Sequence, residues 1–264
     1  MFNLAPLVAL AIVQGLTEFL PVSSSGHLVL LQHWLGAYSG DVFLDVLLHV
    51  GTLGSVLCVY RAEIRRLLRF DPPAIQYIAA IVVGTVPAVI IGLLFKDPIE
   101  RLFASPAAAG AALIFTGLVL FSTRGVRSSG RSHRGEWYPV PPALGRALLI
   151  GCAQALAILP GISRSGTTIT ASLWLKLPRA EAARFSFLLS VPAIAGALVL
   201  HLLDGVAPAG GNWIGAAVGA LIAFAVGLVA IKLTAMAVIQ RHFWKFAFYC
   251  LPLGVLVLLL LSRG

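Results

Sequence analysis

One short stretch of this sequence, Pro160-Gly-Ile-Ser-Arg-Ser-Gly-Thr-Thr168, places hydroxyl side chains and a single arginine between two apolar runs. Pro160 and Gly161 end the segment before it, and a new helix over Ile169–Leu175 is expected to follow. The N-terminus of a helix presents backbone N–H groups to an anion, and a guanidinium can bind two phosphate oxygens at once. The stretch therefore predicts a phosphate or diphosphate site. Its expected members are Ser163, Arg164, Ser165, Gly166, Thr167 and Thr168. A turn between helices, whose arginine meets only lipid headgroups, is the alternative.

A second polar group lies near the start of the chain, inside the apolar run 2–20. Gln14 and Glu18 are four residues apart, so a helix would present both side chains on one face. Their oxygens suit a hard divalent cation, Mg²⁺ or Ca²⁺, that also holds a diphosphate. An ionised group at membrane depth costs about 2.5–3.5 kcal/mol, so Glu18 needs a partner or a function there. The alternative to a metal site is a helix-stabilising Gln14/Glu18 pair that is hydrogen-bonded to the neighbouring hairpin.

A third candidate group follows directly. Pro21 breaks the apolar run, and the sequence Ser23-Ser-Ser-Gly-His27 places hydroxyls within a few residues of a histidine. Near neutral pH a histidine can act as a general base or as a nucleophile, and a nearby hydroxyl can be the group that it activates. Asp45 and His49 share a face of the next expected helix. A structural pairing is the favoured role for them, and the alternative is that they orient His27 or line the cavity.

The composition places these groups in a membrane protein. Of the 264 residues, 59% are hydrophobic and 11% are charged, whereas about 25% of the residues of a soluble domain are charged. The net charge of +9 comes from basic residues in short clusters between apolar runs, which indicates cytoplasmic loops and excludes nucleic acid as the partner. The three cysteines lie inside apolar runs without paired spacing, so they indicate neither disulfides nor a metal site.

The apolar runs divide into expected spans and two broken segments. The broken segments, 2–35 and 142–177, contain the polar stretches described above. They are expected to be re-entrant hairpins, because irregular backbone at membrane depth is tolerated only where it is buried in protein or lines a wet cavity. The remaining runs are long enough to cross a hydrocarbon core of about 30 Å. These expected spans are 42–60, 74–95, 106–122, 185–203, 214–234 and 246–261.

The two halves of the chain, 1–123 and 142–264, repeat one another across a basic linker at 124–141. Ser23-Ser-Ser-Gly-His corresponds to Ser163-Arg-Ser-Gly-Thr at an offset of 140 residues, and shorter matches lie at nearly the same offset. Such self-similarity indicates an internal repeat. Because an odd number of spans separates equivalent points, the second copy is expected to be inverted in the membrane.

The expected fold is therefore an all-α polytopic membrane protein with six transmembrane helices plus two re-entrant helical hairpins in an inverted-topology repeat. The hairpins would enter from opposite faces, so both broken loops would meet near the middle. The arginine excess in the loops 61–71 and 124–137 predicts that these loops lie inside and that both termini lie outside. An arginine at membrane depth must be paired, so Arg164 is expected to contact Glu18, Asp45 or backbone carbonyls.

The motifs Gln14-x-x-x-Glu18, Pro21-Val-Ser-Ser-Ser-Gly-His27 and Pro160-Gly-Ile-Ser-Arg-Ser-Gly-Thr-Thr168 resemble the signature regions of the bacterial undecaprenyl pyrophosphate phosphatases of the bacitracin-resistance type. The resemblance covers essentially the whole chain. It implies removal of the terminal phosphate from the C55 isoprenoid diphosphate, which recycles the lipid carrier for peptidoglycan synthesis at the plasma membrane. It also implies a divalent-metal requirement, with Mg²⁺ or Ca²⁺ as the cation, and an active site that opens to the periplasmic side.

By position, the resemblance makes Glu18 the acidic metal or catalytic residue and makes Ser24 and His27 the nucleophile and base candidates. Gln14 stands where many members of that family have glutamate, so a carbonyl oxygen would replace a carboxylate at this position. The implied diphosphate ligands are Ser163, Arg164 and Thr168. Further substrate contacts are expected from Ser23, Ser25, Gly26, Ser165, Gly166 and Thr167.

The sequence leaves the mechanism open. The diphosphate could be attacked by Ser24 assisted by His27, by His27 itself, or by a water that His27 activates. Inverted repeats with broken helices also occur in transporters, so a transporter or flippase of an anionic lipid or phosphate is the alternative function. The Ser/His cluster facing an arginine favours hydrolysis, since a carrier needs no nucleophile. A homodimer is compatible with the sequence.

Overall fold

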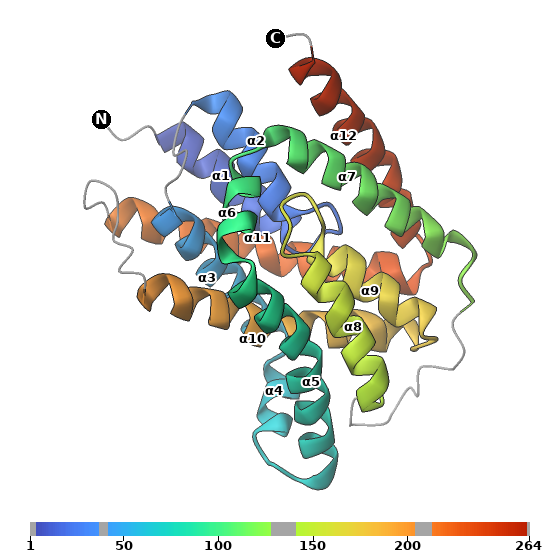
Figure 1. Ribbon diagram of the computed structural model, residues 1–264. Helices are drawn as coiled ribbons and strands as arrows, with labels where there is room; N and C mark the ends of the chain where they lie inside the picture. The colour runs from blue at the N-terminus through green and yellow to red at the C-terminus, as the bar shows by residue number, and fades with distance from the viewer. Residues whose placement is uncertain (1–3, 37–41, 128–140, 204–212, 263–264) are drawn as a thin grey trace.

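The computed structural model describes residues 4–36, 42–127, 141–203 and 213–262, which form helices and contain no strand (Figure 1). The helices are α1 (Leu4–Thr17), α2 (Ser24–Leu35), α3 (Val42–Val59), α4 (Arg61–Leu67), α5 (Pro72–Leu94), α6 (Lys96–Phe103), α7 (Pro106–Phe121), α8 (Leu144–Leu156), α9 (Arg164–Trp174), α10 (Arg179–Leu203), α11 (Trp213–Ile239) and α12 (Ala247–Leu261). Two short 3₁₀ turns, η1 (Ser122–Gly125) and η3 (Phe243–Phe246), follow α7 and precede α12.

Among the described residues, five helical segments are long and apolar enough to cross a membrane. These segments include α5, α7, α10, α11 and α12. The sixth expected span, 42–60, passes the same test only when α3 and α4 are taken together, and these two helices are bent by 77°. The chain is thus an all-helical protein of the multi-pass membrane type.

Two short helices lie in segments where the sequence predicted no helix. α4 lies within the arginine-rich loop expected at 61–71, and α6 lies between the expected spans 74–95 and 106–122. The amphipathic α6 buries none of its residues. No apolar run marks either helix, because both are short and rich in charge. Most of the linker at 124–141 lies outside the described residues.

Each broken segment consists of two helices joined by a loop, and each packs against a long helix of the other half. α1 lies against α11, and α8 lies against α5. α7 packs along α12 and also contacts α2 and α9. The loop between α1 and α2 and the loop between α8 and α9 come together near the centre of the molecule (Figure 1).

Glycines allow the α8–α9 loop to touch the first turn of α2 and the backbone of α7. A Cβ on Gly26 would lie 2.8 Å from the Cα of Gly161, a distance that real Cβ atoms do not adopt. Gly161 itself has a φ of 95°, and a Cβ there would lie 2.4 Å from the carbonyl oxygen of Ala109. Glycine alone tolerates this backbone conformation without strain. The meeting of the two loops, which the sequence predicted, is therefore confirmed.

Candidate active site

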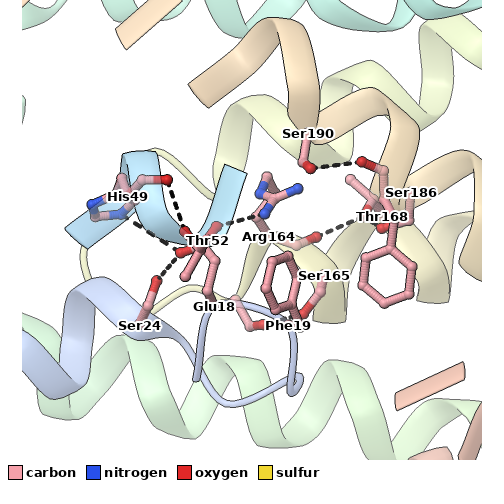
Figure 2. Close-up of polar contacts among 12 residues, drawn as sticks. Glu18, Phe19, Ser24, His49, Thr52, Arg164, Ser165, Thr168, Ser186 and Ser190 are labelled. Atoms are coloured by element: carbon pink, nitrogen blue, oxygen red, sulfur yellow. Dashed lines mark hydrogen bonds and ion pairs between the residues drawn. The ribbon is translucent and has the colours of Figure 1, made fainter. Parts of the chain in front are cut away.

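Glu18 is the centre of the polar cluster between the two loops (Figure 2). Its Oε1 accepts a hydrogen bond from the guanidinium Nη2 of Arg164 at 2.6 Å. Its Oε2 accepts from the Ser24 hydroxyl at 2.7 Å and from the Gln14 amide at 3.0 Å. The Nε2 of His49 lies 3.6 Å from the same oxygen. Since the Glu18 side chain is only 5% exposed, the cluster satisfies a carboxylate that would otherwise be costly to bury.

Arg164 presents a second nitrogen that has no protein partner. Its Nη1 is buried and makes no hydrogen bond within the described part of the chain. The predicted pairing of this arginine is confirmed, because it contacts Glu18, one of the groups named for that role. A buried guanidinium with one nitrogen on a carboxylate and the other uncommitted is suited to bind an anion.

Helix α9 begins at Arg164, so the start predicted at Ile169 was wrong. Ser163 is the N-cap, and its Oγ accepts from the backbone N–H of Gly166 at 3.1 Å. Capping by a serine hydroxyl is a common way to begin a helix. Because the cap lies five residues earlier than expected, the hydroxyl-rich segment belongs to the first turns of the helix itself.

The hydroxyls of this segment bond mostly to protein. Thr167 donates to the carbonyl of Ser163 at 2.9 Å, and Thr168 donates to the carbonyl of Arg164 at 2.7 Å. Thr168 Oγ1 also lies 2.6 Å from the hydroxyl of Ser186 on α10. Ser165 donates to the carbonyl of Leu20 at 3.3 Å, and its Oγ is 3.2 Å from that of Ser163. Among the predicted diphosphate ligands, Arg164 is therefore the one with an uncommitted donor, while the hydroxyls hold the helix start in place.

The Ser24 hydroxyl is positioned by a strained turn. Ser23, the N-cap of α2, has a φ of 69° and a ψ of 103°. A positive φ is uncommon outside glycine, and such strained residues cluster at functional sites. The Oγ of Ser23 accepts from the N–H of Gly26 at 3.3 Å and lies 3.3 Å from the Oγ of Ser25. This turn begins α2 at Ser24, with the hydroxyl on Glu18.

His27 faces away from Ser24. Its Nδ1 lies 2.7 Å from the carbonyl oxygen of Ser23, and its Nε2 lies 2.8 Å from the hydroxyl of Tyr249 on α12. The Ser24 hydroxyl meets Glu18 instead of the histidine. Tyr249 lies 222 residues from His27 and outside every motif, so no sequence pattern points to it.

His49 is the histidine that reaches the cluster. Its Nδ1 lies 2.7 Å from the carbonyl oxygen of Asp45, one turn earlier on α3, so its Nε2 is directed at Glu18 (Figure 2). The Asp45 side chain in turn accepts from the Gln32 amide at 2.9 Å. Of the roles considered from the sequence, the favoured one, a structural pairing, describes His49, which pairs with the Asp45 carbonyl and with Glu18. The signal was present in the four-residue spacing of Asp45 and His49, but the spacing alone did not point to Glu18.

The predicted metal ligands lie together. The Oε1 of Gln14 is buried and has no partner among the described residues, while its amide nitrogen bonds to Glu18. No group of three or more His, Cys, Asp or Glu side chains suited to a metal occurs within those residues. One carboxylate and one uncommitted amide oxygen fit Mg²⁺, which commonly binds through one or two protein carboxylates together with substrate phosphates.

Comparison with known proteins identifies the family. A family model described as bacitracin resistance protein BacA matches residues 7–256. The chain belongs to the BacA family. An undecaprenyl-diphosphatase of Rhodopirellula baltica is 45% identical to this chain over the full length of both proteins. One of Desulfatibacillum aliphaticivorans is 43% identical over 96% of each chain, and undecaprenyl-diphosphatase 4 of Bacillus thuringiensis subsp. konkukian is 42% identical over 95% of each.

The BacA match contains both loops of the candidate site. Gln14 is its first member and Tyr249 its last along the chain, and both lie inside the matched residues. The three relatives named above are matched over 95–100% of this chain. The resemblance first noted in the motifs is thus confirmed at the level of the family.

Proposed function

We propose that this BacA-family protein is an undecaprenyl-diphosphatase, which converts the C55 isoprenoid diphosphate to the monophosphate and inorganic phosphate. The names of the relatives support this function. The single observation in the structure that carries it is the hydrogen bond from the Ser24 hydroxyl to the Glu18 carboxylate, with the Arg164 guanidinium on the other oxygen of that carboxylate. A hydroxyl, a base and a buried cation within one cluster suit phosphoryl transfer.

In the reaction that we propose, the Ser24 oxygen attacks the terminal phosphorus and its proton moves to Oε2 of Glu18. The bond between that phosphorus and the bridging oxygen breaks, so the lipid monophosphate leaves and a phosphoserine remains. Water then hydrolyses the phosphoserine, which releases inorganic phosphate and restores the hydroxyl. The distance of 2.7 Å between Ser24 Oγ and Glu18 Oε2 favours Glu18 over His27 as the base, because a general base must be within hydrogen-bond reach of the proton.

Arg164 would bind the diphosphate and stabilise the charge that develops on it. Its Nη1 is an uncommitted donor in a buried site, where electrostatic interactions are stronger than in water. As the diphosphate engages the guanidinium, the Glu18 carboxylate is left to accept the serine proton. The hydrogen bond between the hydroxyls of Thr168 and Ser186 holds α9, the helix that carries Arg164, against α10.

A divalent cation would be held by Gln14 and Glu18. Its ligands would be the uncommitted Gln14 Oε1, the Glu18 carboxylate and oxygens of the substrate. When bound, such a cation neutralises charge on the diphosphate. The alternative, metal-free role of the pair is a structural hydrogen bond. The Gln14 amide nitrogen makes this bond to Glu18, and it leaves Oε1 of Gln14 for the cation.

We also propose the finer architecture: an inverted repeat with two re-entrant hairpins in the plasma membrane and a site open to the periplasm. Corresponding helices support the repeat. α1 begins at Leu4 and α8 at Leu144, while α2 begins at Ser24 and α9 at Arg164. In a cysteine-free background, the variants Leu68→Cys and Phe103→Cys would test the orientation, because both side chains are exposed. An impermeant thiol reagent added to intact cells should label position 103 and spare position 68, and the reverse pattern would contradict the proposed orientation.

The proposed activity is tested by phosphate release from an isoprenoid diphosphate, using purified protein in detergent. The wild-type protein should release phosphate, and Ser24→Ala should abolish nearly all turnover. A transporter or flippase, the alternative function, would release none. Full activity of the Ser24→Ala variant would exclude the serine mechanism and would leave water or His27 as the attacking group.

A further inference from the structure

The C-terminal helix reaches the loop that precedes Ser24 through two adjacent residues. The hydroxyl of Tyr249 lies 2.8 Å from Nε2 of His27, and the two rings are nearly parallel, with an interplanar angle of 9° and centroids 5.7 Å apart. The neighbouring Cys250 Sγ lies 3.7 Å from the carbonyl oxygen of Pro21. α12 thus contacts both the first turn of α2, at His27, and the loop before it, at Pro21.

The partners of His27 determine its tautomer. Nδ1 lies 2.7 Å from the carbonyl oxygen of Ser23, which can only accept a hydrogen bond, so Nδ1 carries the proton. In a neutral ring Nε2 is then an acceptor, and the Tyr249 hydroxyl donates to it. Both ring nitrogens are therefore occupied, and neither has a lone pair directed at Ser24.

The hydrogen-bonded chain ends on the strained residue. His27 donates its Nδ1–H to the carbonyl oxygen of Ser23, and Ser23 has a φ of 69°. Ser24 is the next residue, and its hydroxyl is 2.7 Å from Glu18. A backbone in a sparsely populated conformation persists only where its surroundings hold it. The chain from Tyr249 through His27 to Ser23 supplies such a contact from an element remote in sequence.

We infer that Tyr249 is a positioning residue for the reaction: its hydroxyl orients His27, which holds the Ser23 carbonyl and thereby keeps the Ser24 hydroxyl on Glu18. This inference rests on the proposed function of Ser24. Tyr249 touches neither Arg164 nor Gln14, so its loss should act on the chemical step and leave substrate binding nearly unchanged.

The test removes one hydroxyl and keeps the ring. Tyr249→Phe should lower kcat by about 5–10-fold, the scale of one neutral hydrogen bond, and should change KM by less than about 2-fold. Tyr60→Phe is the matched control, since it removes a phenolic hydroxyl from a ring that packs against Phe187 instead of His27, and it should leave both constants unchanged. A double-mutant cycle adds His27→Gln. In that background Tyr249→Phe should have no further effect, because the two residues act as one unit.

A measurement that needs no activity distinguishes this inference from the proposed function. In protein labelled with ¹⁵N-histidine, the resonances lost in His27→Gln identify His27, and in the wild type they should show a protonated Nδ1 and an unprotonated, hydrogen-bonded Nε2. Tyr249→Phe should shift the Nε2 resonance. A wild-type His27 protonated at Nε2, or equal kinetic effects of Tyr249→Phe with and without His27, would overturn the inference. If the wild-type protein shows the expected tautomer but releases no phosphate, the proposed function fails while the contact stands.

Discussion

Replacing Arg164 by lysine separates the charge of this residue from its geometry. Lysine keeps the positive charge beside Glu18 but supplies one nitrogen in place of a planar fork. In the structure the arginine uses two nitrogens differently: Nη2 lies 2.6 Å from Glu18, and Nη1 is buried without a partner in the described chain. A single ammonium group cannot serve both positions.

The expected size of the effect follows from the loss of one preorganised donor. Removing such a donor from a site that stabilises developing charge costs about 10²–10³-fold in kcat, so Arg164→Lys should reduce kcat/KM by at least about 10²-fold. That factor corresponds to about 2.7 kcal/mol of transition-state stabilisation. Stability should change little, because the lysine retains an ion pair with Glu18. Arg164→Ala should instead destabilise the protein by about 3–5 kcal/mol, since it leaves a carboxylate that is 5% exposed without its partner.

The assay combines phosphate-release kinetics with thermal unfolding in the same detergent. Arg101→Lys, at an exposed position on α6, is the matched control and should leave both measurements unchanged. In the Arg164→Ala background, Glu18→Gln should recover part of the lost stability, because it removes the unpaired charge. An Arg164→Lys protein with wild-type kinetics would refute the bidentate clamp and would favour simple anchoring to headgroups.

Three further predictions concern the same cluster. Glu18→Ala should remove nearly all phosphate release, and near-normal turnover at low metal concentration would exclude Glu18 from the site. Gln14→Glu should retain activity and shift the concentration of Mg²⁺ needed for half-maximal turnover; an unchanged metal titration would count against a ligand at this position. Gly161→Ala should lower Tm or prevent folding, because the new Cβ would lie 2.4 Å from the Ala109 carbonyl at a φ of 95°. A Gly161→Ala protein that unfolds at the wild-type temperature would show that the α8–α9 loop does not need this close approach to α7.

The sequence predicted those features that depend on local composition and repetition. Apolar runs and arginine-rich loops located the long helices, and the matching motifs at Ser23 and Ser163 showed that two polar loops exist. The cost of an arginine at membrane depth predicts that Arg164 is paired, with Glu18, Asp45 or backbone carbonyls as its candidate partners, and the structure selects Glu18.

The rest depended on contacts between distant segments. The hydroxyl of Tyr249 and the side chain of Ser186 carry no motif, and only the packing of α12 and α10 brings them to the loops. The predicted start of α9 is five residues too late, because Ser163 caps the helix and its hydroxyl bonds to the N–H of Gly166. The four-residue spacing predicts that His49 and Asp45 lie on the same face of α3. It does not predict that the His49 ring approaches Glu18, because that depends on how α3 passes the first loop.

The ion pair between Glu18 and Arg164 has a consequence for the biogenesis of the protein. The two residues are separated by 146 positions, so the first polar loop leaves the ribosome long before its cationic partner exists. At about 5–20 residues per second, this delay is on the order of 7–30 s. A carboxylate without a counter-ion is poorly suited to the hydrocarbon core during that interval. The first loop should therefore reach its final depth only after the second half has been inserted, which makes closure of the site a late event in assembly.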